Sequence, residues 1–277
     1  MVMEAGMSSI RLVVMDLDGT LLDEKRTVPE PVRQRINELQ QKGVLFTLAT
    51  GRLFPSAIRY ARQLSLHTPI IVCNGAMIRD ILEDRMLHHL TLNRELALEV
   101  LRLLKDRGHD ALRFSFYGDE VLTDTPHEQT ENYQQGLGVS FSNVADLSEH
   151  LLQTPDEHPT MLVLMTDPAI THPLTAEIAE KLGDSIFITN SHDYFVEILH
   201  PKATKGEALA QLAASLSIPR ESVMAIGDNR NDLSMIRWAG QGVLVANSPQ
   251  EIRGDADWVT SASRSWGVLE ALNRYFD

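Results

Sequence analysis

The sequence predicts a fold of the α/β class, a doubly wound parallel sheet that carries a second module of the α+β type. Three observations support this prediction. Short apolar segments alternate with segments of helical periodicity at both ends of the chain, the middle of the chain breaks that alternation, and polar residues follow directly after several apolar segments. The 277 residues, 43% of them hydrophobic, are enough for two ordinary domains with buried cores.

The first part of the chain reads strand, helix, strand, helix, strand. Residues 10–15 form an apolar run without alternation, which is typical of a strand buried on both faces of a parallel sheet. Pro29-Glu30-Pro31 begins a helix, and Gly43 ends it. The next elements are a strand at residues 44–49, a helix that carries Ala57, Ile58, Ala61 and Leu64, and a strand at residues 69–73. This order is typical of parallel strands joined by right-handed crossovers.

The middle of the chain has a different order of elements. It contains predicted strands at residues 86–90, 111–117, 159–165, 186–189 and 194–199, and predicted helices at residues 94–105 and 168–182. The last two strands are close enough in sequence to form a hairpin, which indicates an antiparallel sheet. The α/β order then returns with helices at residues 207–216 and 265–275, a short helix ending at Trp238, and strands at residues 222–226, 242–245 and 257–260.

Composition argues against several classes of partner. The net charge of −13 argues against nucleic acid, because binding to a phosphate backbone needs clustered Lys and Arg. No apolar run approaches the roughly 18 residues of a membrane span, and residues 1–9 lack the basic and apolar regions of a secretory signal. The single cysteine, Cys73, excludes an internal disulfide and fits a reducing compartment. We therefore expect a cytoplasmic protein with no membrane partner.

Two aspartates, Asp16 and Asp18, follow the first strand directly. Side chains two residues apart in an extended segment point the same way, so both carboxylates can converge on one small volume. Such a pair of anions is costly unless a cation or a reaction uses it. The alternative is an ordinary solvated turn at Asp18-Gly19, but such a turn needs neither a second aspartate nor a buried strand before it.

Polar residues also stand near the ends of later elements. Thr50 follows the second strand, Lys205 stands near a helix start, and Asp228, Asn231 and Asp232 follow a later strand. Ligands of open parallel sheets bind beyond the carboxyl ends of the strands. Together these residues predict a site for a hard divalent cation and a phosphoryl group. Taken singly, Thr50 could form a turn, Lys205 could be solvated, and Asp228 could cap a helix.

Five short motifs carry a family resemblance. In chain order they are Asp16-Leu17-Asp18-Gly19-Thr20, Thr50-Gly51-Arg52, Asn74-Gly75, Lys205-Gly206 and Gly227-Asp228-Asn229-Arg230-Asn231-Asp232. On these motifs the chain resembles the haloacid dehalogenase (HAD) superfamily, and within it the Cof-type phosphatases with a type-two (C2) cap. The resemblance covers residues 10–276. It implies a Rossmann-like HAD core with an inserted α+β cap, divided into residues 1–83 (core), 84–197 (cap) and 198–277 (core).

The resemblance also implies a role for each matching residue. Asp16 would be the nucleophile that forms an aspartyl-phosphate, and Asp18 the general acid and base. Mg²⁺ would be bound by Asp16, by the backbone carbonyl of Asp18 and by Asp228. The other implied roles are phosphate binding by Thr50, Gly51, Lys205 and Asn231, and support by Arg52, Asn74 and Asp232. Whether Asn231 and Asp232 act on phosphate, on Lys205 or on metal-bound water stays open.

The function that the resemblance implies is a Mg²⁺-dependent phosphatase for a small phosphorylated metabolite, such as a sugar phosphate or pyridoxal phosphate. The alternatives are a phosphomutase of the same superfamily and a phospho-accepting signalling module. Asp18, which would promote hydrolysis, and the cap both argue against the signalling module. The sequence identifies neither the substrate nor the oligomeric state. One departure from the family pattern is Ala246-Asn247-Ser248, where the family usually has a Gly-Asn-Ala turn.

Overall fold

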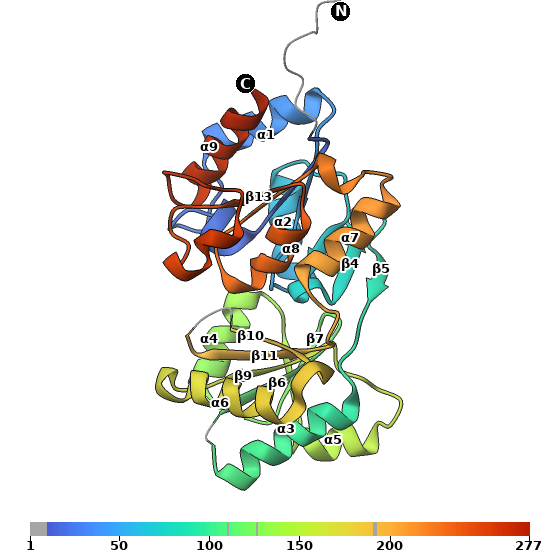
Figure 1. The fold of residues 1–277 in the computed structure, drawn as a ribbon. Helices are drawn as coiled ribbons and strands as arrows, with labels where there is room; N and C mark the ends of the chain where they lie inside the picture. The colour runs from blue at the N-terminus through green and yellow to red at the C-terminus, as the bar shows by residue number, and fades with distance from the viewer. Residues whose placement is uncertain (1–9, 110, 126, 191–192) are drawn as a thin grey trace, which may run out of the picture.

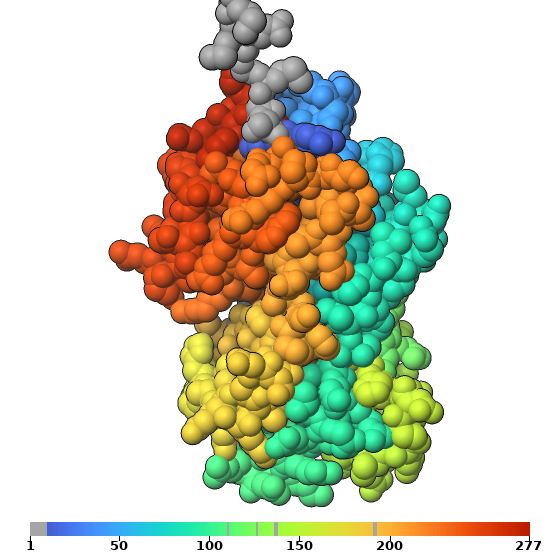
Figure 2. Space-filling view, turned by 45° about the vertical axis from the view of Figure 1, so that its right-hand side comes forward, coloured from blue at the N-terminus to red at the C-terminus, as the bar shows by residue number. Residues whose placement is uncertain are grey.

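The computed structural model describes residues 10–109, 111–125, 127–190 and 193–277. The chain forms two lobes, one above the other in Figure 1. The upper lobe contains the first and last parts of the chain, and the lower lobe contains the middle part. Figure 2 shows the two lobes in contact across a narrower waist. The segment for which we predict no secretory signal, residues 1–9, lies outside the described residues.

A parallel sheet of five strands forms the centre of the upper lobe, as the sequence predicts. In order across the sheet the strands are β14 (Trp258–Val259), β13 (Gln241–Leu244), β12 (Val223–Gly227), β1 (Leu12–Met15) and β2 (Leu45–Leu48). Each neighbouring pair is parallel. The first strand of the chain therefore lies between β2 and β12, and the three strands end at the same edge of the sheet.

Helices cover both faces of this sheet because β1 is apolar on both faces. They are α1 (Glu30–Gln41), α2 (Phe54–Gln63) and α9 (Arg264–Phe276) on one face, and α7 (Lys205–Ser215) and α8 (Leu233–Trp238) on the other. Val13 and Met15 belong to the first hydrophobic cluster. Leu12 and Val14 belong to the second. All four side chains are fully buried, which explains why this strand reads as a continuous apolar run.

A three-stranded antiparallel sheet extends the upper lobe. It consists of β3 (Ile70–Val72), β4 (Met77–Asp80) and β5 (Arg85–His89). A parallel bridge between Ala49 and Ile71 joins this sheet to the end of β2. β5 lies inside the predicted cap segment, residues 84–197, yet it pairs with β4. The division into residues 1–83, 84–197 and 198–277 itself stays a prediction.

The lower lobe contains a mostly antiparallel sheet of six strands, as predicted for the inserted module. In order they are β10 (Phe187–Thr189), β11 (Phe195–Leu199), β9 (Met161–Met165), β6 (Leu112–Tyr117), β7 (Glu120–Thr123) and β8 (Phe141–Asn143). β10 and β11 pair as the predicted hairpin, whereas β7 and β8 are parallel. One face carries α3 (Arg94–Arg107), α5 (Leu147–Gln153) and α6 (Pro168–Leu182), which pack against Leu162 and Leu164 of β9.

The opposite face of this sheet is turned toward the upper lobe. Phe114, Phe116 and Phe195 belong to the same hydrophobic cluster as Leu53 and Phe54 of the upper lobe. The two lobes are therefore joined by apolar packing as well as by the chain. Within the described ranges, no helix combines the length and the apolar character that a membrane span requires.

The polar stretch after β7 contains a helix that the sequence pattern does not reveal. α4 (Glu128–Leu137) follows an N-cap in which the His127 side chain accepts a hydrogen bond from the Gln129 amide. Tyr133 on this helix packs edge-on against Phe114 at 5.0 Å between ring centroids. A helix with so few apolar positions lacks the apolar periodicity by which a helix is recognised in a sequence.

Candidate active site

The predicted site residues follow strands that are neighbours in the sheet. Asp16 and Asp228 come directly after β1 and β12, and Thr50 follows Ala49 beyond the end of β2. These strands lie in the order β12-β1-β2. Oxygen atoms of Asp16, Asp228 and Asp232 all lie within 4.8 Å of one another. The acidic groups near the start of the chain and those near residue 228 therefore meet, as the sequence analysis predicts.

A tight turn at Leu17–Leu21 joins the first motif to the last. Gly19 has φ +87°, and a Cβ atom there would lie 2.3 Å from Asp228 Oδ2. Only glycine avoids both the strained backbone and this collision. The next residue, Thr20, donates a hydrogen bond from Oγ1 to Asp228 Oδ1 at 2.7 Å. Gly19 and Thr20 thus hold two segments together that are 208 residues apart in the chain.

Lys205 lies beneath the acidic cluster and is fully buried. Its Nζ donates to Asp16 Oδ1 and to Asp232 Oδ1, each at 2.6 Å. Burial alone would lower the pKa of Lys205, but the charges of Asp16 and Asp232 raise it above its ordinary value, so the ammonium group stays charged. Lys205 is held in place by the start of α7, where Thr204 caps the helix by accepting from the Glu207 amide.

Asp232 organises its surroundings rather than facing the open site. Its Oδ1 accepts from Lys205, and its Oδ2 accepts from the backbone amides of Asp228 and Asn229 at 2.9 Å each. The contact with the Asn229 amide is one half of a capping box that starts the turn at Arg230–Asp232. Of the roles that the sequence leaves open for Asp232, the contacts favour orienting Lys205.

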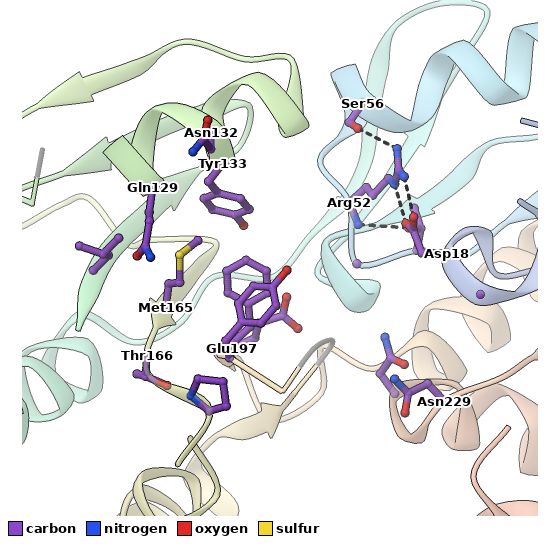
Figure 3. A pocket seen from close by; sticks show the side chains of 18 of the residues that line it. Asp18, Arg52, Ser56, Gln129, Asn132, Tyr133, Met165, Thr166, Glu197 and Asn229 are labelled. Atoms are coloured by element: carbon purple, nitrogen blue, oxygen red, sulfur yellow. Dashed lines mark hydrogen bonds and ion pairs between the residues drawn. The ribbon is translucent and has the colours of Figure 1, made fainter. Parts of the chain in front are cut away.

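Arg52 holds Asp18. Its Nε and Nη2 donate to the two carboxylate oxygens of Asp18 at 2.6 Å each, in the fork geometry that only arginine provides. Nη1 of Arg52 also contacts Ser56 Oγ at 3.3 Å and Tyr60 Oη at 3.4 Å. The Arg52 amide donates to Thr50 Oγ1 at 3.1 Å. Figure 3 shows Asp18, Arg52 and Ser56 together on the core side of the cavity.

A buried chain of hydrogen bonds connects the last motif to the sheet of the lower lobe. Asn231 Nδ2 donates to Asn74 Oδ1 at 3.0 Å, and Asn74 Nδ2 donates to Glu197 Oε2 at 3.0 Å. Asn74 adopts a left-handed conformation with φ +54°, and its side-chain oxygen would lie 3.1 Å from a Cβ atom at Gly51. Glu197 belongs to β11 of the lower lobe, so this chain of contacts spans both lobes.

The sequence pattern did not identify two residues of the site, Asn247 and Glu197. Asn247 Nδ2 donates to the Gly19 carbonyl at 2.9 Å and to Asp228 Oδ2 at 3.3 Å, and Asn247 Oδ1 accepts from the Arg264 amide at 2.8 Å. Its position just after β13, at the same sheet edge as Asp16 and Asp228, was the available signal. Glu197 sits within a buried strand of the cap and offers no comparable signal.

The site opens into a cavity of about 1640 Å³ between the two lobes. Among the predicted residues, Asp16, Asp18, Thr50, Gly51, Arg52, Asp228 and Asn231 line it. Lys205, Asn74 and Asp232 lie behind them, within contact distance of the lining residues. Residues of the lower lobe, among them Gln129, Tyr133 and Thr166, face the site from the other side (Figure 3).

The charges of the cluster fit a divalent cation. Burial and the neighbouring charge of Asp232 raise the pKa of Asp228 to about 7. Burial also raises the pKa of Asp16, although Lys205 opposes the effect. Three close carboxylates and one ammonium group leave an excess of negative charge, and carboxylate oxygens are ligands that Mg²⁺ prefers. Asp16 and Asp228 would hold the ion, since both line the open cavity, whereas Asp232 lies behind them against Lys205.

Comparison with known proteins agrees with this architecture. The chain is 28% identical over 282 residues to phosphatase YwpJ of Bacillus subtilis, with 95% of this chain and 99% of that protein covered. It is 29% identical over 279 residues to the 5-amino-6-(5-phospho-D-ribitylamino)uracil phosphatase YitU of the same organism, with 96% and 97% covered. A haloacid dehalogenase-like hydrolase from Bacteroides thetaiotaomicron superposes with a TM-score of 0.81 at 25% identity, covering 96% of this chain and all of that one.

The family model named haloacid dehalogenase-like hydrolase matches residues 13–272, from β1 to the middle of α9. The match includes every motif from Asp16 to Asp232 and runs through both lobes. This chain belongs to the haloacid dehalogenase-like hydrolase family.

Proposed function

We propose that this protein is a Mg²⁺-dependent phosphatase that hydrolyses a small phosphate monoester through an aspartyl-phosphate intermediate. The observation that carries the proposal is the meeting of Asp16, Asp228 and Lys205 at the carboxyl ends of β1 and β12. Membership of the hydrolase family and the likeness to named phosphatases support the reaction type.

In the first step, a carboxylate oxygen of Asp16 attacks phosphorus in line with the ester oxygen. The new bond joins phosphorus to Asp16, and the bond to the ester oxygen breaks. Asp18 supplies a proton to that leaving oxygen, so the product leaves as an alcohol. The Arg52 fork holds the Asp18 carboxyl group at the edge of the cavity, and Asp18 would release one of these two hydrogen bonds when it carries the proton.

In the second step, a water molecule attacks the phosphorus of the aspartyl-phosphate. Asp18 takes the proton of that water, and the bond between phosphorus and Asp16 breaks. Inorganic phosphate leaves, and Asp16 and Asp18 return to their starting protonation states. The cap would exclude bulk water from this site and contact the alcohol part of the substrate.

The remaining residues bind the phosphoryl group and the metal. Thr50, Gly51, Lys205 and Asn231 would hold phosphate oxygens, while Arg52, Asn74 and Asp232 position these groups. Mg²⁺, held by Asp16, the Asp18 backbone carbonyl and Asp228, would neutralise charge that otherwise repels the phosphate. Lys205 compensates part of the negative charge on Asp16 before substrate binds.

Hydrolysis of p-nitrophenyl phosphate by the purified protein tests this function. We expect many turnovers with Mg²⁺, none after dialysis against EDTA, and recovery when Mg²⁺ is returned. A burst that stops after one equivalent would support a phospho-accepting module instead. Equal rates with and without the chelator would contradict the metal site.

The substrate class is proposed from the family and from the named relatives. A small phosphorylated metabolite, such as a sugar phosphate or a related monophosphate, fits a site with one phosphate-binding end. For YitU the named substrate joins a phosphorylated sugar alcohol to an aminouracil ring. Phosphate release from a panel of phosphorylated metabolites identifies the substrate, and the appearance of an isomerised phosphate ester without release would indicate a phosphomutase.

A further inference from the structure

The half of the cavity that belongs to the cap is lined by aromatic rings. Tyr133, Tyr194 and Phe195, here called the aromatic wall, all line the cavity. The rings of Tyr133 and Phe195 are 5.0 Å apart between centroids, and those of Tyr194 and Phe195 are 4.6 Å apart. Tyr194 remains 40% exposed. Phe195 is only 6% exposed, so Tyr194 supplies most of the ring surface that the aromatic wall offers to a ligand in the cavity.

A carboxylate lies beside the aromatic wall. Glu197 lines the cavity from β11 with only 5% of its surface exposed. Phe195 and Glu197 lie two residues apart on β11, so their side chains are on the same face of the sheet. Burial, and next the charge of Glu197, raise the pKa of the Tyr133 hydroxyl well above its ordinary value. Figure 3 shows Glu197 between the cap residues, such as Tyr133 and Met165, and the core residues Asp18 and Arg52.

The charges on the cap side disfavour a second anion in the ligand. Among the cap residues that the structure describes along this cavity, the acidic ones are Asp167 and Glu197, and none is lysine or arginine. His109 and His127 are the titratable bases on that side. A second phosphate group placed here would meet carboxylates without the arginine or lysine partners that phosphates need.

We infer that the cap half of the cavity binds the alcohol part of the substrate, and that this part carries a flat aromatic ring and an amine but no second anionic group. This inference rests on the phosphatase function proposed above. The ring stacks on the aromatic wall, and the amine, as an ammonium group, is attracted by Glu197 and by the faces of the rings. The phosphate of the same molecule lies at Asp16. The cavity therefore recognises one end of the substrate by its phosphoryl group and the other end by its charge and shape.

Matched substrates test the charge and the ring separately. Pyridoxamine 5′-phosphate and pyridoxine 5′-phosphate differ by an amine in place of a hydroxyl on the same ring, and glucosamine 6-phosphate carries an amine without a flat ring. We expect kcat/KM for pyridoxamine 5′-phosphate to exceed that of either other ester by roughly tenfold, as befits one extra charge contact at a partly buried site. Equal values for the three esters, or preference for pyridoxine 5′-phosphate, would overturn the inference.

A substitution of Glu197 identifies the source of the preference. Glu197→Gln keeps an oxygen that can accept from Asn74 but removes the charge, so the ratio of kcat/KM for pyridoxamine to pyridoxine phosphate should fall close to one. Glu120→Gln, at an exposed position of β7 in the same sheet, is the matched control and should leave the ratio unchanged. If Glu197 served only to hold the lobes together, both substrates would lose rate alike and the ratio would stay, which contradicts the inference.

The two proposals fail in different ways. Absence of phosphate release from p-nitrophenyl phosphate by the unsubstituted protein would refute the phosphatase itself. Turnover of p-nitrophenyl phosphate with no preference among the three matched esters would refute only the inference on the cap. Faster hydrolysis of fructose 1,6-bisphosphate than of fructose 6-phosphate would also refute it, because the cap half would then accept a second anion.

Discussion

Lys205 is the residue that allows Asp16 and Asp232 to be buried side by side. Two buried carboxylates without a cation would lose their hydration and repel each other. The ammonium group contacts both at 2.6 Å, and none of its own surface is exposed. Because Lys205 neutralises only part of the negative charge, the site still attracts a cation at Asp16 and Asp228.

The fork between Arg52 and Asp18 leads to a prediction about catalysis. Arg52→Lys keeps the positive charge but cannot donate two parallel hydrogen bonds, so Asp18 loses its fixed orientation. We expect kcat for p-nitrophenyl phosphate to fall roughly tenfold to a hundredfold with little change in thermal stability. Arg62→Lys, on the exposed side of α2, is the control and should behave like the unsubstituted protein. Unchanged kcat in Arg52→Lys would show that the fork does not serve proton transfer.

Asn247 supports a prediction about metal affinity. It donates to the Gly19 carbonyl and to Asp228 Oδ2, so it orients one of the proposed metal ligands. Loss of such an outer contact commonly weakens metal binding about 10–100-fold. The Mg²⁺ concentration that gives half-maximal activity should therefore rise by a similar factor in Asn247→Ala. Asn37→Ala, on an exposed position of α1, is the control; an unchanged Mg²⁺ requirement in Asn247→Ala would contradict the role.

At the scale of elements, close backbone contacts place the start of α7 in the site. Gly75 has φ +103°, and a Cβ atom there would lie 2.2 Å from the Thr204 carbonyl oxygen. Thr204 caps the helix that begins with Lys205. The turn after β3 can therefore approach α7 only because residue 75 has no side chain.

This contact predicts a difference between two glycine substitutions. Gly43 has φ +89° but no atom within 4 Å of a Cβ, so Gly43→Ala should cost only the backbone strain of about 1–2 kcal/mol. Gly75→Ala adds a collision with backbone and should lower the free energy of unfolding by about 3 kcal/mol or more. Thermal or chemical denaturation of the two variants measures this difference, and equal losses would contradict the tight packing.

The elements of the upper lobe could be predicted because the local pattern and the tertiary environment agree. β1 is a central strand that is buried on both faces, and this burial accounts for its uninterrupted apolar run. The lower lobe was harder to predict. β7, β8, α4 and α5 are short or largely polar, and their positions depend on packing between segments distant in sequence. β4 was missed because its second half, Arg79 and Asp80, is polar and half-buried.

At the scale of the whole molecule, the site is assembled from segments at both ends of the chain, and the lower lobe, from the middle of the chain, faces it across the cavity. Motifs located the core residues because each stands at a strand end or at a helix start, where the topology of the sheet brings them together. Glu197 and Asn247 could not be found in this way. Their roles arise from contacts with Asn74, Gly19 and Asp228 that no local spacing encodes.

The most direct test of the account is the site of phosphorylation during a single turnover. Excess protein is mixed with p-nitrophenyl phosphate and Mg²⁺, quenched in acid, digested and examined by mass spectrometry. We predict that one phosphoryl group appears on the peptide containing Asp16, only when Mg²⁺ is present, and that Asp16→Asn protein shows neither the modification nor turnover. A phosphoryl group on a different peptide, or phosphate release that persists in Asp16→Asn protein, would contradict the central claim.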